Sequence, residues 1–370
     1  ILPLNVNGLN TLEKRKQIVN IMRKQKGDIV ILQETHFRKE APPLQQNTAY
    51  FTFQTSADKK QKGVGIFINK NGPFKLLKCV PDPQGHFIIV VCTIGESLLT
   101  LASVYSPNDK QQTFYDRFFT SLSKHNRGQI MIGGDLNAVL NANRDRYDPK
   151  NPGKKHSETL SVYIGAKLKN MGLTDAWRER NPFKNDYTFY SNPNGTYSRI
   201  DYVLLSSPLL ANVSTAKIQM CSWSDHNPVK IILKDLGLPK YTAIWRLNEA
   251  ILTNPQIRTQ IEGELTTYFQ YNDTPDLRKS VIWEAHKSYI RGIIIKICSI
   301  KKKAKLEKVK DLTTQIEQKE KLYRTNPSNR LSQQLRQLKT ELNLYLMEDV
   351  EKQIRWMKQR FYAKANKIDT

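Results

Sequence analysis

Hydrophobic residues in the first 235 positions gather in short runs separated by longer amphipathic stretches. Apolar runs of about four to eight residues bounded by turn residues are typical of buried strands. Such runs occur at 28–35, 63–69, 86–94, 98–107, 129–137, 198–206 and 227–234. Helical periodicity indicates helices over 10–27, 111–125 and 159–172. This order is neither a strict strand–helix–strand repeat nor a hairpin meander. We therefore predict an α/β sandwich of two mixed sheets with helices outside.

The pattern changes near residue 236, where "LGLPKY" is typical of a linker. From residue 247 onward no run predicts a strand. The apolar run "GIIIKICSI" at 292–300 is short, but helical sequence flanks it on both sides. We predict three parts: the sandwich over 1–235, a linker over 236–246 and an all-α region over 247–370.

Two long charged helices are predicted over 300–325 and 328–365, separated at Pro327, which cannot continue a helix. Large apolar residues alternate steps of four and three, which is the spacing of a coiled-coil seam. The seam of the second helix comprises Leu331, Leu335, Leu338, Leu342 and Tyr345, with a shifted phase through Leu346, Val350, Ile354, Met357 and Phe361. The weaker seam of the first comprises Leu306, Val309, Thr313, Ile316 and Tyr323. We predict a long antiparallel helical hairpin, with self-association if the seams pair between molecules.

The chain is strongly basic, with a formal charge of +24 and a pI near 9.7. Residues 1–235 carry 32 Lys and Arg against 19 Asp and Glu, and the remainder carries 26 against 15, so both parts are basic. Nucleic acid is the partner that such a charge favours, because neutralised phosphates release counterions. Solubility alone and an anionic membrane surface are weaker interpretations.

Compartment signals are few. The four cysteines have no C-x-x-C pair and no zinc spacing with histidine, which indicates buried thiols in a reducing compartment. No apolar run reaches 18 residues, so we expect no membrane span. We also expect no signal peptide, and because the sequence starts inside an apolar run without Met, we expect a few residues of the first strand to be missing.

Polar residues stand where the predicted strands end. The stretch "IMIGGDLNAVL" at 130–140 ends a buried run on Asp135 and Asn137, which lie on one face because they are two residues apart. Ligand clefts open at such strand ends. The same placement applies to Asn5 with Asn7, Glu34, Tyr105, Asp201, Asp225 and His226.

This set of residue types is chemically coherent. Four carboxylates are hard oxygen ligands suited to Mg²⁺ or Mn²⁺, and a single histidine beside a carboxylate can stabilise developing negative charge. No cysteine or serine of the set has a base neighbour that would make it a covalent nucleophile. Metal-assisted hydrolysis of a phosphodiester is the reaction that these residues favour.

The residues also stand in motifs that follow one another in a recognisable order: "LNVNGL", "LQETH", "VYSPN", "GGDLN", "SRIDYV" and "SDHNPV". This series resembles the endonuclease/exonuclease/phosphatase superfamily, which includes the apurinic/apyrimidinic endonucleases and deoxyribonuclease I. The resemblance covers residues 1 to about 233. It implies a four-layer αββα sandwich and metal-dependent phosphodiester cleavage.

A second resemblance covers the whole chain. "LQETHF", "GHFIIV", "YTFYSNPNGTYSRIDYVL" and "SDHNPVKI", then "IWRLNEAIL" and a basic helical region ending in "KANKID", are similar to the second open reading frame protein of LINE-type non-LTR retrotransposons. That family places an endonuclease first, then a helical tower or linker, then a reverse transcriptase. We expect the polymerase to begin about where this sequence stops. No Asp-Asp pair occurs, so this chain is expected to nick DNA without synthesising it.

The resemblance implies a metal site and a water site. Glu34 is the main Mg²⁺ ligand, with Mn²⁺ as a substitute, and Asp225 and Asn5 complete the implied metal set. Asp135 orients or deprotonates the attacking water. Asn137 and Asn5 bind the scissile phosphate and the water.

The resemblance also implies a group that acts on the phosphate and a group that faces nucleic acid. Asp201 and Asp225 orient His226, which stabilises the pentacovalent transition state, and Tyr105 contacts the phosphate or the leaving group. The implied nucleic-acid-binding residues are Arg146, Thr188 and Ser198.

Several of these assignments have alternatives that the sequence leaves open. The register of Asn5 and Asn7 is open, although the motif match favours Asn5. Tyr105 is equally a packed aromatic residue, and Thr188 equally a residue with strand propensity. The "KKKAKLEKVK" run at 301–310 is either a solvated helix face or a nucleic-acid contact or localisation signal.

The leading hypothesis is a Mg²⁺-dependent endonuclease that nicks one strand of duplex DNA and leaves a 3′-hydroxyl, which by resemblance primes reverse transcription of the element RNA. We expect that RNA to bind the helical region or the absent polymerase, and the protein to occupy nucleus and cytoplasm in a ribonucleoprotein particle. The loops at 57–63 and 191–197 are the expected groove contacts. Alternatives are an abasic-site repair endonuclease, a phosphatase or sphingomyelinase, and a decayed nucleic-acid-binding scaffold.

Overall fold

A computed structural model divides the chain into two compact units, Ile1–Tyr241 and Thr242–Thr370. It describes residues 1–24, 27–37, 49–57, 61–149, 151, 157–191, 194–221, 223–234, 247, 249–326 and 328–346. The predicted linker at 236–246 and the shifted seam beyond residue 346 lie outside these ranges. The predicted domain limits therefore stay predictions.

The first sheet of the N-terminal unit has four strands in the order β1-β2-β4-β3. Strands β1 and β2 are parallel, and the other pairs are antiparallel. The strands are β1 (Leu2–Asn5), β2 (Ile29–Gln33), β3 (Tyr50–Thr55) and β4 (Val64–Asn69). Helix α1 (Leu12–Lys24) covers the outer face, where Ile18 and Met22 pack on Val30 and Leu32.

The second sheet has six strands in the order β10-β13-β8-β7-β6-β5, with only β7 and β8 parallel. The strands are β5 (Phe74–Pro81), β6 (Phe87–Ile94), β7 (Ser97–Tyr105), β8 (Gln129–Asp135), β10 (Leu173–Asp175) and β13 (Asp201–Ser206). Helices α2 (Gln111–His125) and α3 (Thr159–Asn170) cover its outer face through an aromatic-rich cluster that includes Phe114, Phe118 and Leu122.

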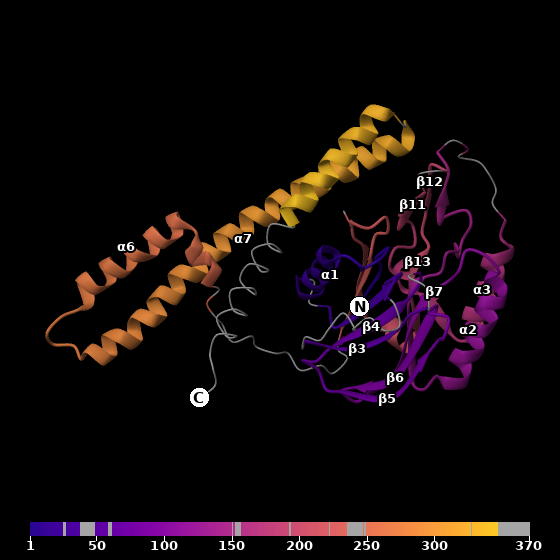
Figure 1. Cartoon of the computed structure of the whole chain (residues 1–370), viewed down its shortest axis with the longest axis horizontal. Coiled ribbons are helices and arrows are strands. Elements are labelled where there is room, and N and C mark those ends of the chain that lie inside the picture. The colour runs from indigo at the N-terminus through magenta and orange to yellow at the C-terminus, as the bar shows by residue number, and fades with distance from the viewer. Residues whose placement is uncertain are drawn as a thin grey trace. The chain divides into compact units, whose positions relative to one another are not determined.

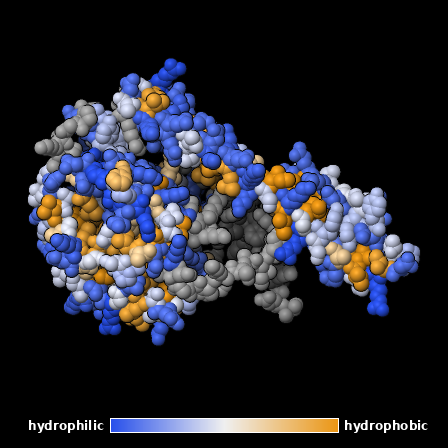
Figure 2. Space-filling model, turned by 180° about the vertical axis from the view of Figure 1, so that it is seen from behind, coloured by the Kyte–Doolittle hydropathy of each residue, from blue (hydrophilic) through white to orange (hydrophobic). Residues whose placement is uncertain are grey.

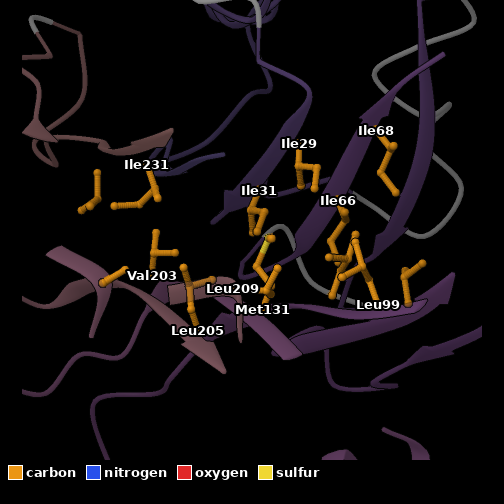
Figure 3. Close-up of a cluster of buried hydrophobic side chains, with 14 of the residues drawn as sticks. Ile29, Ile31, Ile66, Ile68, Leu99, Met131, Val203, Leu205, Leu209 and Ile231 are labelled. Atoms are coloured by element: carbon orange, nitrogen blue, oxygen red, sulfur yellow. The ribbon is translucent and has the colours of Figure 1, made fainter. Parts of the chain in front are cut away.

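The inner faces of the two sheets pack on each other. Successive side chains of a strand point to opposite faces, so Ile29 and Ile31 enter the shared core while Val30 and Leu32 face α1. Figure 3 shows Ile29, Ile31, Ile66 and Ile68 of the first sheet above Leu99, Met131, Val203 and Leu205 of the second. Helix, sheet, sheet and helices thus form the four-layer αββα sandwich that was predicted (Figure 1).

Smaller elements complete this unit. A three-stranded sheet in the order β11-β12-β9 and a hairpin of β14 and β15 lie beside the main sheets. Their bounds, with the two short helices, are β9 (Arg146–Tyr147), β11 (Phe189–Ser191), β12 (Thr196–Ser198), β14 (Val213–Ile218), β15 (Val229–Leu233), α4 (Ala176–Arg180) and α5 (Ser207–Ala211).

Every regular element among the described residues of the C-terminal unit is helical, as predicted. It contains a 3₁₀ turn η1 (Glu249–Thr253), α6 (Pro255–Asn272), the long α7 (Lys279–Thr325) and a helix over 329–346. Ile257 and Ile261 of α6 pack on Ile294 and Ile297 of α7. Within the described helices none is long and apolar enough to cross a membrane.

Helix α7 and the helix over 329–346 form the predicted antiparallel hairpin. Lys319 Nζ donates to Gln334 Oε1 at 2.8 Å, Lys339 Nζ lies 2.7 Å from Glu320 Oε1, and Lys308 Nζ lies 3.4 Å from Glu341 Oε1. The seam of the second helix is confirmed, with Leu335 and Leu342 buried. The seam of the first was wrong at one end: Leu306 is 58% exposed, and Leu312 is buried instead. The partner helix reaches the face that carries Leu312 and Ile316, and Leu306 lies off it.

Large apolar side chains are exposed at some positions of both units. Figure 2 shows a mainly hydrophilic surface with separate hydrophobic groups between the polar ones. Scattered exposed apolar residues are ordinary in folded proteins. Leu306 belongs to this exposed class, which makes it a natural control for the buried seam.

Ile316→Ala is expected to destabilise the hairpin by about 2–5 kcal/mol, because Ile316 is fully buried and alanine leaves a cavity. Leu306→Ala is expected to stay within about 0.5 kcal/mol. Amide hydrogen exchange over 329–346 measures both variants. Equal loss of protection in the two would contradict the register described above.

Candidate active site

Strand pairing brings the predicted residues to one edge of the sandwich. In the register of the sheets Asn5 lies opposite Gln33, Tyr105 opposite Asp135, and Asp135 opposite Asp201. Asn5 and Glu34 come from the first sheet. Tyr105, Asp135 and Asp201 come from the second. The side chains therefore meet where the two sheets face each other.

Two glycines before Asp135 allow this close approach. A Cβ at Gly133 would lie 2.7 Å from Ile31 Cδ1 across the core. One at Gly134 would lie 2.0 Å from the carbonyl oxygen of Val104 on β7. Any side chain at these positions would push the strands apart, so the "GGD" motif has a steric reason.

Asn5 is the centre of the site and is fully buried. Its Nδ2 donates to Glu34 Oε1 at 2.8 Å and to Asp135 Oδ2 at 3.0 Å. Its Oδ1 accepts from the backbone N–H of Asn7 at 3.0 Å. Asn7 is exposed and donates through its own side chain to Asp225 Oδ1 at 3.3 Å. The structure thus places Asn5, and not Asn7, between the carboxylates.

Glu34 is held as an ionised carboxylate. Burial raises its pKa, but hydrogen bonds from His36, Asn5 and Tyr105 together lower the pKa below the usual value. The residue has a left-handed φ of 51°, which side chains rarely adopt. Such backbone strain concentrates at functional sites, and here it turns the carboxylate toward Asn5.

His226 and Asp201 form a charge-assisted pair. The His226 Nδ1 lies 2.8 Å from Asp201 Oδ2, and the other ring nitrogen, Nε2, lies 3.9 Å from Asp135 Oδ2. Burial lowers the pKa of His226, but Asp201 first, then Asp135 and Asp225, raise it to about 10. The ring is thus an imidazolium near neutral pH, with Nε2–H facing Asp135.

The pKa of Asp135 is raised as well. Burial and the charge of Asp201 raise its pKa toward about 7, and His226, Asn5 and the backbone N–H of Asn137 oppose that rise. The Asn137 N–H donates to Asp135 Oδ1 at 2.8 Å. A carboxylate whose pKa is raised is a better proton acceptor near neutral pH, as its predicted role with water requires.

Tyr105 and Asn137 complete the edge of the site. Burial and the charge of Glu34 raise the pKa of Tyr105 well above its usual value, so its phenol is a neutral donor, hydrogen-bonded to Glu34. Asn137 Nδ2 donates to the Ser106 carbonyl at 2.6 Å. Tyr105 is therefore more than a packed aromatic residue, and Asn137 is partly engaged by the backbone.

Asp225 lies at the rim of the site and is exposed. It accepts from Asn7 and, at 3.4 Å, from the Ser224 hydroxyl, which also donates to the Asn5 carbonyl at 2.7 Å. It reaches His226 only through its charge, whereas Asp201 binds that ring directly. The assignment of Asp225 as a metal ligand stays a prediction.

The residues predicted to bind nucleic acid are distributed between surface and interior. Arg146 is exposed on β9, opposite Ser198 of β12. Ser198 is buried, and Thr188 is fully buried. The Thr188 hydroxyl accepts from the backbone N–H groups of Ile200 at 3.1 Å and Asp201 at 3.2 Å. Thr188 thus holds the backbone of Asp201 in place. A nucleic-acid contact by Arg146, Thr188 and Ser198 stays a prediction.

The sequence missed two histidines next to the site. His36 Nε2 lies 3.1 Å from Glu34 Oε2. His86, in the "GHFIIV" motif, is buried, and its Nδ1 lies 2.9 Å from the Tyr105 carbonyl. The spacing of Glu34 and His36, two residues apart in "ETH", was the available signal.

The donor set fits a divalent metal with a preference for oxygen. Glu34 is ionised and 19% exposed, so its carboxylate is reachable. Within the described residues Asp135, Asp201 and His226 also present atoms within 4.8 Å of one another. The Nδ1 of His226 is already engaged by Asp201 Oδ2 at 2.8 Å. The predicted place of the metal, at Glu34 and Asn5, stays a prediction.

The chain belongs to the Endonuclease/Exonuclease/phosphatase family, which matches residues 4–226. This places it among hydrolytic nucleases and phosphodiesterases and agrees with the four-layer fold and the acidic, histidine-containing site.

Individual relatives are a transposon protein and a nuclease. The chain is 28% identical over 261 residues to the Transposon TX1 uncharacterized 149 kDa protein of Xenopus laevis, covering 67% of this chain and 19% of that protein. It is 24% identical over 255 residues to an exodeoxyribonuclease of Bacillus subtilis (strain 168), covering 62% of this chain and 97% of that protein. The chain thus spans about a fifth of the TX1 protein. The first match confirms the predicted resemblance to a transposable-element protein.

Solved structures share the fold of the N-terminal unit. An AP endonuclease from Archaeoglobus fulgidus has a TM-score of 0.53 at 18% identity and covers 63% of this chain and 98% of that chain. The 3′ phosphatase NExo from Neisseria, bound to a product DNA hairpin, has a TM-score of 0.52 at 22% identity with the same coverage. These likenesses concern the fold alone.

Proposed function

We propose that this protein is a Mg²⁺-dependent DNA endonuclease that nicks one strand of duplex DNA and leaves a 3′-hydroxyl, which primes reverse transcription of retrotransposon RNA. The observation that carries the proposal is the hydrogen-bonded chain from Glu34 through Asn5 to Asp135, with the His226–Asp201 pair beside it. The similarity to a transposon protein supports the biological setting.

The residues divide the work of hydrolysis. Glu34 and Asn5 would hold the metal, which supplies a Lewis acid for a phosphate oxygen when it is bound. Asp135 accepts the proton of the attacking water, whose oxygen forms the new bond to phosphorus. The bond from phosphorus to the 3′ oxygen breaks, and that oxygen takes a proton from solvent water to end as a hydroxyl. His226, as an imidazolium, and Tyr105, as a neutral phenol, stabilise the negative charge that develops on the phosphate.

Three further points belong to the proposal. The basic helical unit binds element RNA, through positive charge such as the run at 301–310. The hairpin mediates self-association if its seam also pairs between molecules. A protein with these partners works in a ribonucleoprotein particle in cytoplasm and nucleus.

Removal of the metal is expected to stop nicking completely. Supercoiled plasmid incubated with the protein and Mg²⁺ should convert to open circle, and EDTA should abolish the conversion because Glu34 then lacks the cation that it orients. Agarose gel electrophoresis measures both. Nicking that persists in EDTA would contradict metal dependence, and DNA binding without any nicking would leave the decayed scaffold.

The same assay separates the endonuclease from a repair enzyme. An intact AT-rich duplex and a matched duplex with one abasic site are compared under identical conditions. The proposal expects cleavage of the intact duplex at a comparable rate, with ends that a DNA polymerase extends. Cleavage confined to the abasic duplex would favour the repair endonuclease, and ends that cannot be extended would contradict the priming role.

A further inference from the structure

His36 touches the carboxylate that is proposed to hold the metal, yet the mechanism above gives it no role. Its Nε2 lies 3.1 Å from Glu34 Oε2, while Asn5 Nδ2 binds the other oxygen, Oε1, at 2.8 Å. The His36 side chain is 23% exposed, so it lines the open side of the site. Glu34 is therefore fixed at both of its oxygens.

The direction of the His36 bond follows from the state of Glu34. An ionised carboxylate accepts hydrogen bonds and donates none. A carboxylate that binds a metal is deprotonated, so Glu34 Oε2 accepts from His36 as Oε1 accepts from Asn5 Nδ2. The His36 Nε2 therefore carries the proton and donates to Oε2.

The backbone holds the His36 ring in one place. Both Glu34 and His36 have left-handed φ angles, 51° and 55°. The His36 N–H donates to the Lys62 carbonyl at 2.8 Å, and the Gly8 N–H donates to the Glu34 carbonyl at 2.8 Å. On its other side the ring meets Gly8, where a Cβ would lie 3.0 Å from His36 Nδ1.

The left-handed backbone angles of Glu34 and His36 cost free energy, which a loop that only connects two strands would not need. Residues with side chains rarely adopt left-handed angles, and two in three positions persist only where surrounding contacts impose them. Gly8 leaves space for the ring, and the Lys62 carbonyl fixes its backbone. The result is that Nε2–H points at one carboxylate oxygen, Glu34 Oε2.

We propose that His36 is a positioning residue that presents the Glu34 carboxylate to the divalent metal. The inference rests on the proposed function, because it assigns Glu34 to the metal. Groups that hydrogen-bond a metal-binding carboxylate fix its orientation, and their loss weakens metal binding or activity by about 10–100-fold. His36 acts through Glu34 and needs no contact with the substrate.

The test compares His36→Leu, which removes the donor, with His36→Gln, whose amide can donate to Oε2. His125→Leu is the matched control, because His125 is a half-buried histidine at the end of α2, beside Lys78. Mn²⁺ binding is measured by electron paramagnetic resonance on the full chain, and nicking is measured against Mg²⁺ concentration. Thermal unfolding reports whether each variant is folded.

The expected result is Mn²⁺ binding weakened about 10–100-fold in His36→Leu. A similar rise in the Mg²⁺ concentration for half-maximal nicking should accompany it, with the rate at saturating Mg²⁺ largely retained. His36→Gln should recover most of the affinity, and His125→Leu should behave as wild type. Recovery by an amide of different shape is not expected of a ring that merely packs.

Three results would overturn the inference. Unchanged Mn²⁺ affinity in His36→Leu, with wild type binding and nicking normally, would remove the role of His36 and leave the proposed function intact. Equal weakening in the Leu and Gln variants would show that the ring fills space. A wild type that neither binds Mn²⁺ nor nicks DNA would overturn the proposed function and the inference together.

Discussion

Asp135→Asn is expected to slow nicking by about 10²–10⁴-fold, the contribution of a positioned general base. The amide cannot take the proton of the attacking water. It also presents an NH₂ group where Asn5 Nδ2 and the His226 imidazolium need an acceptor. The loss should fall on kcat, because DNA binding depends mainly on positive charge elsewhere.

Stability of this variant should change little or rise. Asp135 is buried next to Asp201, and this is why its pKa is raised. Removing one of two neighbouring carboxylates relieves that repulsion. The control is Asp116→Asn, an exposed carboxylate on α2 that pairs with Lys167. Plasmid nicking and thermal unfolding measure both variants, and wild-type nicking by Asp135→Asn would place the base elsewhere.

Asp145→Ala is expected to destabilise the N-terminal unit by about 3–5 kcal/mol, because it removes one of the two carboxylates that pair with the buried Arg199. Asp145 is fully buried and Arg199 is 1% exposed. Arg199 Nε and Nη2 donate to Asp145 at 2.8–3.0 Å, and its Nη1 donates to Asp175 Oδ2 at 2.5 Å. Arg178 Nη2 adds a bond to Asp145 Oδ1 at 2.6 Å.

A double variant distinguishes the effect of the ion pair on stability from the effect of the volume that its side chains fill. Asp145→Leu with Arg199→Met removes both charges together, and such replacements are often neutral or stabilising where single removal is not. We expect the double variant to be more stable than Asp145→Ala in urea unfolding. Asp148→Ala, at a half-buried carboxylate outside this pair, should stay within about 0.5 kcal/mol. A double variant less stable than the single one would mean that the ion pair is itself a net source of stability.

The sequence predicted the fold class and the position of the site for one physical reason. In α/β sheets, polar residues at the ends of buried strands face the cleft, so Glu34, Asp135 and Asp201 were identifiable from pattern and motif together. Asn5 was distinguished from Asn7 only by the motif, and the structure supports that choice. Strands β3 and β5 were not predicted, because each is an edge strand of its sheet and its residues are mostly half-buried or exposed.

Contacts that depend on tertiary structure were not predictable from the sequence. The register of α7 is an example, since Leu306 and Leu312 are equally apolar and only the partner helix selects one of them. His36 meets Glu34 because both residues leave the strand with left-handed angles. The pairing of Arg199 with Asp145 joins residues 54 positions apart. No local pattern encodes such contacts.

The residues of the site come from two sheets, so the hydrophobic core between the sheets sets the distance between these residues. Asn5 reaches Asp135 across the gap at 3.0 Å, and beneath them Gln33 Nε2 reaches Ser103 Oγ at 3.3 Å. A hydrogen bond weakens when it lengthens by a few tenths of an ångström, whereas one extra methylene between the sheets forces larger shifts. The size of the core side chains thus sets the distance between the sheets and, with it, the length of the Asn5–Asp135 hydrogen bond. Residues that never contact the substrate therefore limit how the site can vary.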